Sequence, residues 1–337
     1  MAEKKVLYPF RLNTRQRIQY IGSMTYSDGG QTRLEIPNVG FLSGLLIRLT
    51  GTVTLSAAGA LADLGPWSLI RRLVVGLNLG QLNIVDVSGY GAFITNLLRT
   101  HNSNIDSASQ IYAAPVAAGA NTWELNLYVP IGANNGENFD FGLINLQAPE
   151  VQAFCQITWG TPADFSTLVT ATSITAHVSY LYYEVPDPRE VKWPANVVHR
   201  ILEDQQPITQ TGENAYTVLR QGVIGRLAHY LRLNGARSAS VDELRLRINK
   251  TDTIYSVRRE HQYLLQNTRY GRSLPTGVFV WDFWYADESV TRGDFRDTIY
   301  SDAVTTLESV PVITSGATMG TNNNFLNTVR EIFQALQ

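Results

Sequence analysis

The hydrophobic pattern of the chain is dominated by alternation, and residues 41–55 show it most clearly. Most apolar side chains of this stretch fall on one parity, while Arg48 and a row of threonines fall on the other. A period of two predicts a half-buried β-strand, here an unusually long one. A membrane span needs roughly 20 apolar residues, and a charge at its centre is costly in lipid. We therefore interpret residues 41–55 as a strand and not as a membrane span.

Further strands are predicted along the first half of the chain. They cover residues 70–77, 81–87, 123–131, 151–159 and 174–183. Pro66 suits the first turn of a short helix before residue 70, because its missing N–H costs nothing there. One longer helical period covers residues 90–101, with Ser88 as its N-cap. Several strands at short spacing, separated by Gly, Asn and Pro, predict a β-sandwich.

A proline-rich stretch separates the two halves of the chain. Pro186, Pro188 and Pro194 fall within nine residues and predict a stiff, extended linker. The resulting division assigns residues 1–30 to a basic N-terminal arm and lead-in, 31–186 to a first domain, 187–194 to the linker and 195–337 to a second domain. A length of 337 residues suits two domains of about 150 residues each.

The second half repeats the order of elements of the first. Strands are predicted at residues 197–209, 215–233, 241–249, 277–285, 304–314 and 325–336. A helical period lies between the third and fourth of them, followed by a polar turn over residues 267–275. The apolar positions that define this period are Ile254, Val257, His261, Leu264 and Leu265. The two halves share an architecture but no residue-level repeat.

Composition narrows the classes of function. The net charge is −2 and charged residues make up only 17%, so charge does not drive nucleic-acid binding, and no sequence-specific nucleic-acid partner is expected. A surface with few charges suits a protein covered by neighbours. The single cysteine, Cys155, excludes an intramolecular disulfide and lies on the apolar parity of its strand, so we expect a buried thiol. The first residues lack an apolar core of signal-peptide length.

The N-terminal segment is the one clear charge asymmetry. Five cations in its first 17 residues face a single acid, Glu3. They are Lys4, Lys5, Arg11, Arg15 and Arg17. The segment is either a solvated arm or a contact for anionic lipid head groups or packaged nucleic acid, to which each cation would contribute on the order of 1 kcal/mol.

No catalytic or metal-binding motif is found. The five histidines lack metal-ligand spacing, and no nucleophile elbow or cofactor motif occurs. His101 and His261 fall on the apolar side of the two predicted helices, which favours buried, hydrogen-bonded histidines. We predict no enzyme activity, catalytic residue, metal or cofactor.

A carbohydrate-active or carbohydrate-binding protein is the alternative function. Its site would combine acids with aromatics, either Asp282 with Trp281 and Trp284 or Glu124 with Trp123 and Tyr128. The competing interpretation is packing. Trp281, Phe283 and Tyr285 form one face of their strand and Trp284 lies on the other, which predicts a strand buried on both sides, at the contact between domains or between subunits.

Several motifs resemble one family. Residues 39–77 contain a Gly-Leu-Leu-Ile-Arg strand core and the turn Asp63-x-Gly65-Pro66-x-x-Leu69-Ile70-x-Arg72. The run Val87-Ser88-Gly89, residues 125–130 and residues 275–282 follow in order. These motifs, in this order, resemble those of the double jelly-roll major capsid proteins of tectivirus-type, membrane-containing bacteriophages.

The resemblance implies a fold and a function. The fold would be all-β, with two eight-stranded jelly rolls side by side, each with a short helix in a loop between strands. The function would be that of a virion protein, assembled in the host cytoplasm, whose homotrimers form pseudo-hexagonal blocks of an icosahedral shell around an internal membrane. Partners would be further copies of the chain, penton and minor capsid proteins, and that membrane, with the basic arm facing inward.

Overall fold

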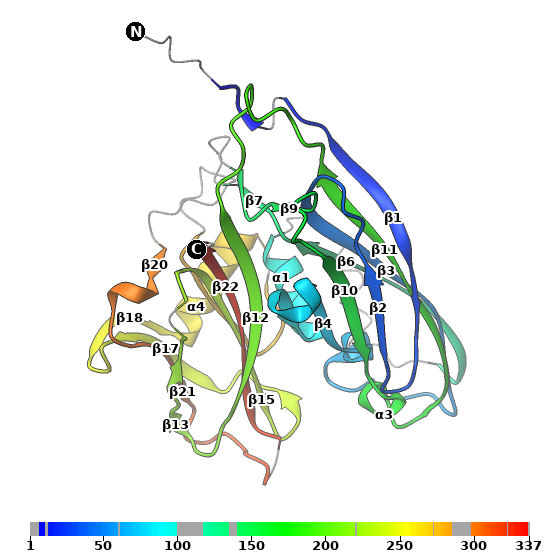
Figure 1. Ribbon diagram of the computed structural model, residues 1–337. Coiled ribbons are helices and arrows are strands. Elements are labelled where there is room, and N and C mark those ends of the chain that lie inside the picture. The colour runs from blue at the N-terminus through cyan, green and yellow to red at the C-terminus, as the bar shows by residue number, and fades with distance from the viewer. Residues whose placement is uncertain are drawn as a thin grey trace.

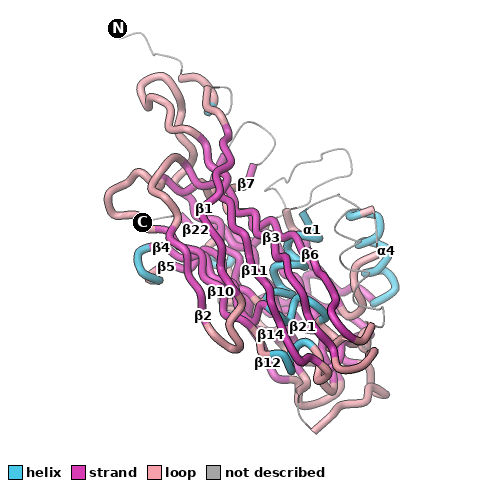
Figure 2. The backbone as a smooth tube through the Cα atoms, turned by 90° about the vertical axis from the view of Figure 1, so that its right-hand side faces the viewer, coloured by secondary structure: helices cyan, strands magenta, loops and turns pink. Residues whose placement is uncertain are grey.

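The computed structural model describes residues 7–10, 13–59, 61–99, 117–134, 140–219, 221–271, 273–284, 298–321 and 323–335. Within these residues the protein consists of two β-sandwiches that stand side by side, with the first half of the chain on the right of Figure 1 and the second on the left. Strands make up most of the backbone, and the helices lie at their margins and between them (Figure 2).

The first sandwich packs two sheets over one core. The outer sheet has the antiparallel order β1-β11-β3-β6, and the inner one contains the run β5-β4-β10-β2. The outer strands are β1 (Gln16–Thr25), β11 (Val169–Tyr183), β3 (Phe41–Leu55) and β6 (Gly119–Pro130), with β9 (Ile144–Asn145) beside β3. The inner strands are β2 (Gln31–Glu35), β10 (Ala153–Trp159), β4 (Ile70–Leu77) and β5 (Leu82–Val87). A small hairpin pairs β7 (Ala133–Asn134) with β8 (Asp140–Phe141).

The second sandwich repeats this arrangement. Its inner sheet has the order β12-β22-β15, with β16, β19 and β20 also paired to β15, and its outer sheet runs β13-β21-β17-β18 with β14 paired to β21. The inner strands are β12 (Val197–Pro207), β22 (Phe325–Ala335), β15 (Val223–Leu233), β16 (Ala236–Arg237), β19 (Val278–Asp282) and β20 (Ile299–Tyr300). The outer strands are β13 (Gly212–Glu213), β14 (Tyr216–Thr217), β21 (Leu307–Ile313), β17 (Val241–Ile248) and β18 (Asp252–Arg258).

The two inner sheets are one continuous sheet. Strand β12 pairs in parallel with β5, through Ile201 opposite Val85 and Leu202 opposite Asp86. The ten strands so joined cross from one sandwich into the other. The two halves are therefore joined by backbone hydrogen bonds in addition to side-chain packing.

The helices are short. They are α1 (Gly89–Arg99), α3 (Pro162–Phe165) and α4 (Arg259–Tyr270), with the 3₁₀ turns η2 (Gly65–Leu69), η3 (Asn78–Gly80) and η5 (Ser301–Ala303). As predicted, Ser88 caps α1, because the Gly91 N–H donates to Ser88 Oγ at 3.0 Å. Pro66 lies in the first turn of η2, and the Trp67 ring stacks on Phe93 of α1 at 4.8 Å.

The helical period predicted around residue 254 is partly wrong. Ile254 and Val257 lie in β18, which pairs with β17, and the helix begins only at Arg259 and continues to Tyr270. The hairpin turn has Asn249 and Lys250 at φ of 52° and 68°, the left-handed backbone that tight hairpins require. Its β-branched and aromatic residues then favour a strand over a helix.

Three further expectations need correction. Residues 16–25, assigned to the arm and lead-in, form β1 and pair with β11. Residues 215–233 form two strands, because Gly222 turns the chain at φ 85°. His261 is exposed and not buried, while His101 lies outside the described residues.

No helix among the described residues is both long and apolar enough to span a bilayer.

Candidate functional site

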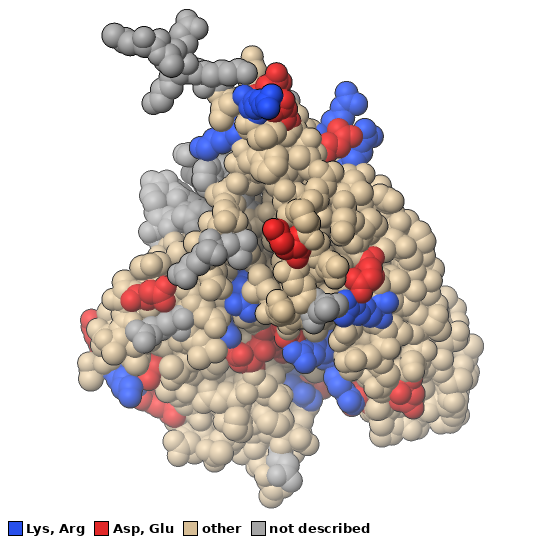
Figure 3. Space-filling model, in the orientation of Figure 1, with Lys and Arg blue, Asp and Glu red and all other residues tan. Residues whose placement is uncertain are grey.

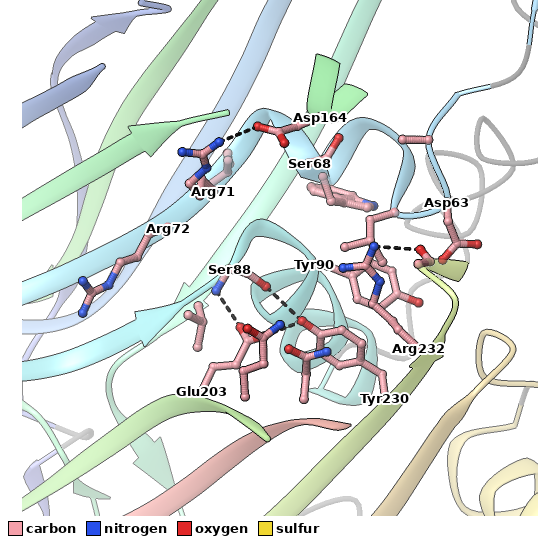
Figure 4. Close-up of a pocket in the computed structure, with 18 of the residues that line it drawn as sticks. Asp63, Ser68, Arg71, Arg72, Ser88, Tyr90, Asp164, Glu203, Tyr230 and Arg232 are labelled. Atoms are coloured by element: carbon pink, nitrogen blue, oxygen red, sulfur yellow. Dashed lines mark hydrogen bonds and ion pairs between the residues drawn. The ribbon is translucent and has the colours of Figure 1, made fainter. Parts of the chain in front are cut away.

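The contact of β12 with β5 is bordered by a polar cavity of about 480 Å³, and we call this region the seam. Figure 3 shows acidic and basic side chains gathered between the two lobes. Figure 4 shows that they come from both halves: Asp63, Arg71 and Ser88 from the first, Glu203, Tyr230 and Arg232 from the second. The seam thus combines backbone pairing between the two sandwiches with a cavity lined by residues of both.

Glu203 connects the halves at the seam. Its Oε2 accepts a 2.6 Å hydrogen bond from the Ser88 N–H at the start of α1, and its Oε1 accepts one from the Tyr230 hydroxyl. Burial raises the pKa of Glu203, which these two hydrogen bonds only partly offset. Glu203 therefore holds a proton more tightly than an exposed glutamate does.

Ion pairs surround this contact. Asp63 Oδ2 accepts hydrogen bonds from the backbone N–H of Arg237 at 2.7 Å and from its Nε at 3.2 Å, again joining the two halves. On the first-half wall, Arg71 pairs with Asp164 at 2.8 Å and Arg72 with Asp86 at 2.5 Å. The seam carboxylates other than Glu203 therefore have cationic partners, and the contact of Asp63 with Arg237, like that of Glu203 with Ser88, joins the two halves.

A second polar cluster lies on the inner sheet of the second sandwich, on the face that turns away from the second core and towards the first half. Arg226 on β15 is directly opposite Asp282 of β19 and Glu331 of β22 in the sheet register. Its guanidinium lies 3.0 Å from Asp282 and 2.8 Å from Glu331, and both carboxylates are about 1% exposed. His199 Nε2 lies 3.3 Å from the other Glu331 oxygen, and the Tyr270 hydroxyl donates to Asp282. Burial opposes the charge of Arg226, but the surrounding anionic groups outweigh it and raise its pKa.

The two alternative carbohydrate sites have different surroundings, and Asp282 and Trp281 of the first site line one cavity of about 290 Å³. Asp282 is bound in the Arg226 cluster, while Glu124 is on the solvent face of β6 and pairs with Arg48 at 2.9 Å. Hydrogen bonds from Arg48 and Asn126 lower the pKa of Glu124, the opposite of what a general acid needs. Trp123 packs against Phe165 in the first core. Glu124 and Trp123 therefore point to opposite faces of β6, and the second alternative site is not formed.

The residues predicted to pack between domains or between subunits lie in two different places, as far as the structure describes them. Trp281 and Phe283 belong to the second core and stack on each other at 6.4 Å. Trp284 packs with Phe333 and with Ala133 of the first half, so it lies where the two sandwiches meet. Tyr285 lies outside the described residues.

The basic arm is described only in part. Lys4, Lys5 and Arg11 lie outside the described residues, Arg15 is exposed, and Arg17 pairs with Glu184 at 2.7 Å. Tyr8 bridges to Val191 of the linker, which brings the N-terminal segment and the linker together.

Two buried groups have structural roles. Burial raises the pKa of Cys155 to about 12, as expected of an inert core thiol. His229 is fully buried, and its two ring nitrogens lie 2.8 Å from the hydroxyls of Thr328 and Ser309; burial lowers its pKa to about 3. The described residues contain no cluster of three or more metal-ligating side chains.

Comparison with known proteins gives matches of structure but not of sequence. No family model and no curated protein sequence matches the chain. The structure superposes on the major capsid protein of Sulfolobus turreted icosahedral virus with a TM-score of 0.71 at 13% identity, over 95% of this chain and 97% of that one. The fold is a double jelly roll.

Two further structures extend the comparison. The PBCV-1 virus capsid protein matches with a TM-score of 0.67 at 11% identity, over 99% of this chain and 96% of that one. The major capsid protein P2 of bacteriophage PM2 matches with a TM-score of 0.52 at 12% identity, over 96% and 98%. The predicted double jelly roll is thereby confirmed, with both rolls present in one chain.

Sequence reasoning did not identify Glu203, Arg226 or Glu331. The only signal was a charged residue flanked by apolar positions of a strand, as at Arg226. Their partners depend on which strands become neighbours, and the local pattern does not contain that information.

Proposed function

We propose that this chain is a viral major capsid protein that self-assembles into homotrimers, each a pseudo-hexagonal block of an icosahedral shell. The observation that carries the proposal is the full-length match to double jelly-roll capsid proteins, at 95–99% coverage of this chain. Three chains with two rolls each present six similar bodies around one axis. The proposed role is structural rather than enzymatic.

The geometry of the seam supports such a role. A shell block must transmit lateral force without changing shape, and here a ten-stranded sheet and the Glu203 and Asp63 contacts join the two rolls. Obligate interfaces between subunits run to 2,000 Å² or more, which the flanks of two tall sandwiches can provide. Closed packing of the flanks would also cover the open sheet edges that otherwise invite aggregation.

The finer parts of the proposal concern location and partners. The protein would reside in the virion of a bacteriophage after assembly in the host cytoplasm. It would contact further copies of itself, penton and minor capsid proteins, and an internal membrane.

Electron microscopy of the purified protein tests the proposed function. We expect two-dimensional class averages with six lobes, two from each of three chains. Particles with two lobes at all concentrations would contradict the capsid role.

The arm is proposed as the inward-facing contact. Because β1 begins at Gln16 and Tyr8 bridges to the linker, a deletion limited to residues 1–6 removes Lys4 and Lys5 without disturbing the described fold. We expect the deletion to reduce sedimentation with anionic vesicles, relative to neutral ones, while trimers persist. Loss of trimers instead would make the arm a clamp between subunits, and unchanged sedimentation would exclude a lipid contact by these lysines.

A further inference from the structure

Helix α4 has its polar residues inside and its leucines outside. Gln262, Gln266 and Tyr270 are buried, at 2–4% exposure. Leu264 and Leu265 are 63% and 45% exposed. An amphipathic helix that serves only its own core shows the reverse pattern. The apolar face of α4 is therefore arranged for something other than the core beneath it.

The neighbouring strand extends this apolar surface. On β18, Ile254 is 40% and Tyr255 is 49% exposed. We call Ile254, Tyr255, Leu264 and Leu265 the α4–β18 patch. Among the described residues β18 pairs only with β17, so the patch lies on an open sheet edge. Exposed apolar clusters of this kind mark interaction surfaces.

A cavity of about 290 Å³ opens within the patch. Tyr255 and Leu265 of the patch line it together with Trp281 and Phe283, and its polar lining residues include Gln262, Arg269, Tyr270 and Asp282. Gln266 also lines it, and neither its amide nitrogen nor its amide oxygen has a hydrogen-bond partner among the described residues, although the side chain is 2% exposed. Buried polar groups are nearly always paired. The cavity thus suits an aromatic ring that carries one hydroxyl.

The opposite flank of the molecule offers such a group. Tyr20 and Ile18 on β1 are 56% and 65% exposed, and Leu46 on β3 is 38% exposed. In the sheet register Tyr20 lies opposite Ser179, which lies opposite Leu46, so the two side chains share one row and one face. We call Ile18, Tyr20 and Leu46 the β1 patch. Figure 1 shows β1 and β18 on opposite flanks of the protein.

We propose that the α4–β18 patch of one chain binds the β1 patch of a second copy, with Tyr20 of that copy in the Gln266 cavity. This inference rests on the proposed self-assembly and identifies the two surfaces through which the copies would bind each other. The Tyr20 ring packs between Tyr255, Trp281 and Phe283, and its hydroxyl pairs with the Gln266 amide. Among the described residues of one chain, the Tyr20 hydroxyl has a long hydrogen bond of 3.4 Å with His177 Nδ1. Because the two patches differ and lie on opposite flanks, the contact is head-to-tail, and the proposed trimer forms when the rotation between successive copies closes the ring.

Site-directed cross-linking tests the contact directly. The single cysteine, Cys155, is buried and does not interfere. We expect the double variant Tyr20→Cys/Leu264→Cys to form disulfide-linked dimers and trimers on mild oxidation, with each single variant giving none. The matched control is the double variant Tyr300→Cys/Leu264→Cys, which moves one cysteine from position 20 to position 300. Tyr300 is 57% exposed and lies outside both patches. A ladder with Tyr300→Cys/Leu264→Cys but not with Tyr20→Cys/Leu264→Cys would overturn the proposal.

Trimer dissociation measured by native mass spectrometry gives a second readout. We expect Tyr20→Ala or Leu264→Ser to raise the dissociation constant by about tenfold or more, as for a central interface residue. Tyr20→Phe and Gln266→Leu should each have a smaller effect, and their combination should add little, because both remove the same hydrogen bond. Tyr300→Ala should have no effect.

The outcomes separate the two proposals. A wild-type trimer that tolerates Tyr20→Ala and Leu264→Ser overturns this interface and leaves the capsid function standing. A wild-type chain that never forms a trimer overturns the proposed function itself. Unchanged thermal unfolding of the monomeric variants shows that a loss of trimer does not arise from misfolding.

Discussion

Helices α1 and α4 occupy corresponding places in the two rolls but use their apolar residues in opposite ways. In α1 the residues Tyr90, Phe93 and Leu97 are at most 2% exposed. In α4 the leucines face out and two glutamines face in. The comparison teaches that one helix directs its apolar residues into the core of its own chain, whereas the other exposes its leucines on the surface that we propose a second copy covers.

The largest expected difference between the helices is in the stability of the isolated chain. Phe93→Ala removes a ring stacked on Trp67 at full burial, and we expect it to lower the free energy of unfolding by about 3–5 kcal/mol. Leu264→Ala should change it by no more than about 0.5 kcal/mol. Urea unfolding at a concentration where the chain is monomeric measures both. Equal losses would show that α4 also serves the core.

The next largest expected effect is on the pH dependence of the free energy of unfolding, and it involves the carboxyls near the starts of the two helices. Burial raises the pKa of Glu203, below α1, so its contribution to stability is fully present below the unfolded-state pKa of about 4.5 and is lost as the pH rises towards the folded-state pKa. We expect Glu203→Gln, relative to wild type, to become progressively more favourable between pH 5 and pH 8. Unfolding free energies at both pH values measure it.

Glu260 in the first turn of α4 is the matched control. Hydrogen bonds lower its pKa, so its contribution is present above the unfolded-state pKa and is lost as the pH falls. Glu260→Gln should therefore keep a constant difference from wild type between pH 5 and pH 8 and lose it only below about pH 4.5. A Glu203→Gln variant with no pH-dependent difference from wild type would contradict the burial argument.

The smallest effect is expected at the helix caps. Ser88→Ala removes the side-chain cap of α1 and should cost about 1 kcal/mol. The N-cap of α4 is Arg258, which makes no capping hydrogen bond with its side chain, so Arg258→Ala should lose no capping energy. Thermal unfolding compares the two. A similar loss for both would mean that capping does not distinguish the helices.

The strands of the fold were largely predictable from the sequence. The bounds predicted for the strands at residues 41–55 and 70–77 coincide with β3 and β4, because a sandwich strand buries one face and the alternation records it. The α1 period and its Ser88 cap were equally local signals. Prediction succeeded where the apolar pattern of a segment points into its own core.

The α4 region shows where this reasoning stops. The apolar positions of residues 254–265 have helical spacing, but several of them face away from the core. The assumption that an apolar stripe marks the buried side of one helix merged a strand and a helix into one element. An outward-facing apolar stripe has the same sequence signature as an inward-facing one, and only packing distinguishes them.

The polar clusters were beyond sequence reasoning for a different reason. Arg226 meets Asp282 and Glu331 because three strands distant in sequence are neighbours in one sheet. Glu203 meets Ser88 because β12 pairs in parallel with β5 across the seam. Such contacts depend on tertiary register, which no local pattern contains.

The native mass of the purified chain tests the central claim most directly. The account predicts a stable species near three times 37.5 kDa in the absence of any ligand. Its amount should fall on dilution in variants of the α4–β18 patch and remain unchanged in Tyr300→Ala. A wild-type protein that remains at 37.5 kDa over the accessible concentration range would contradict the account.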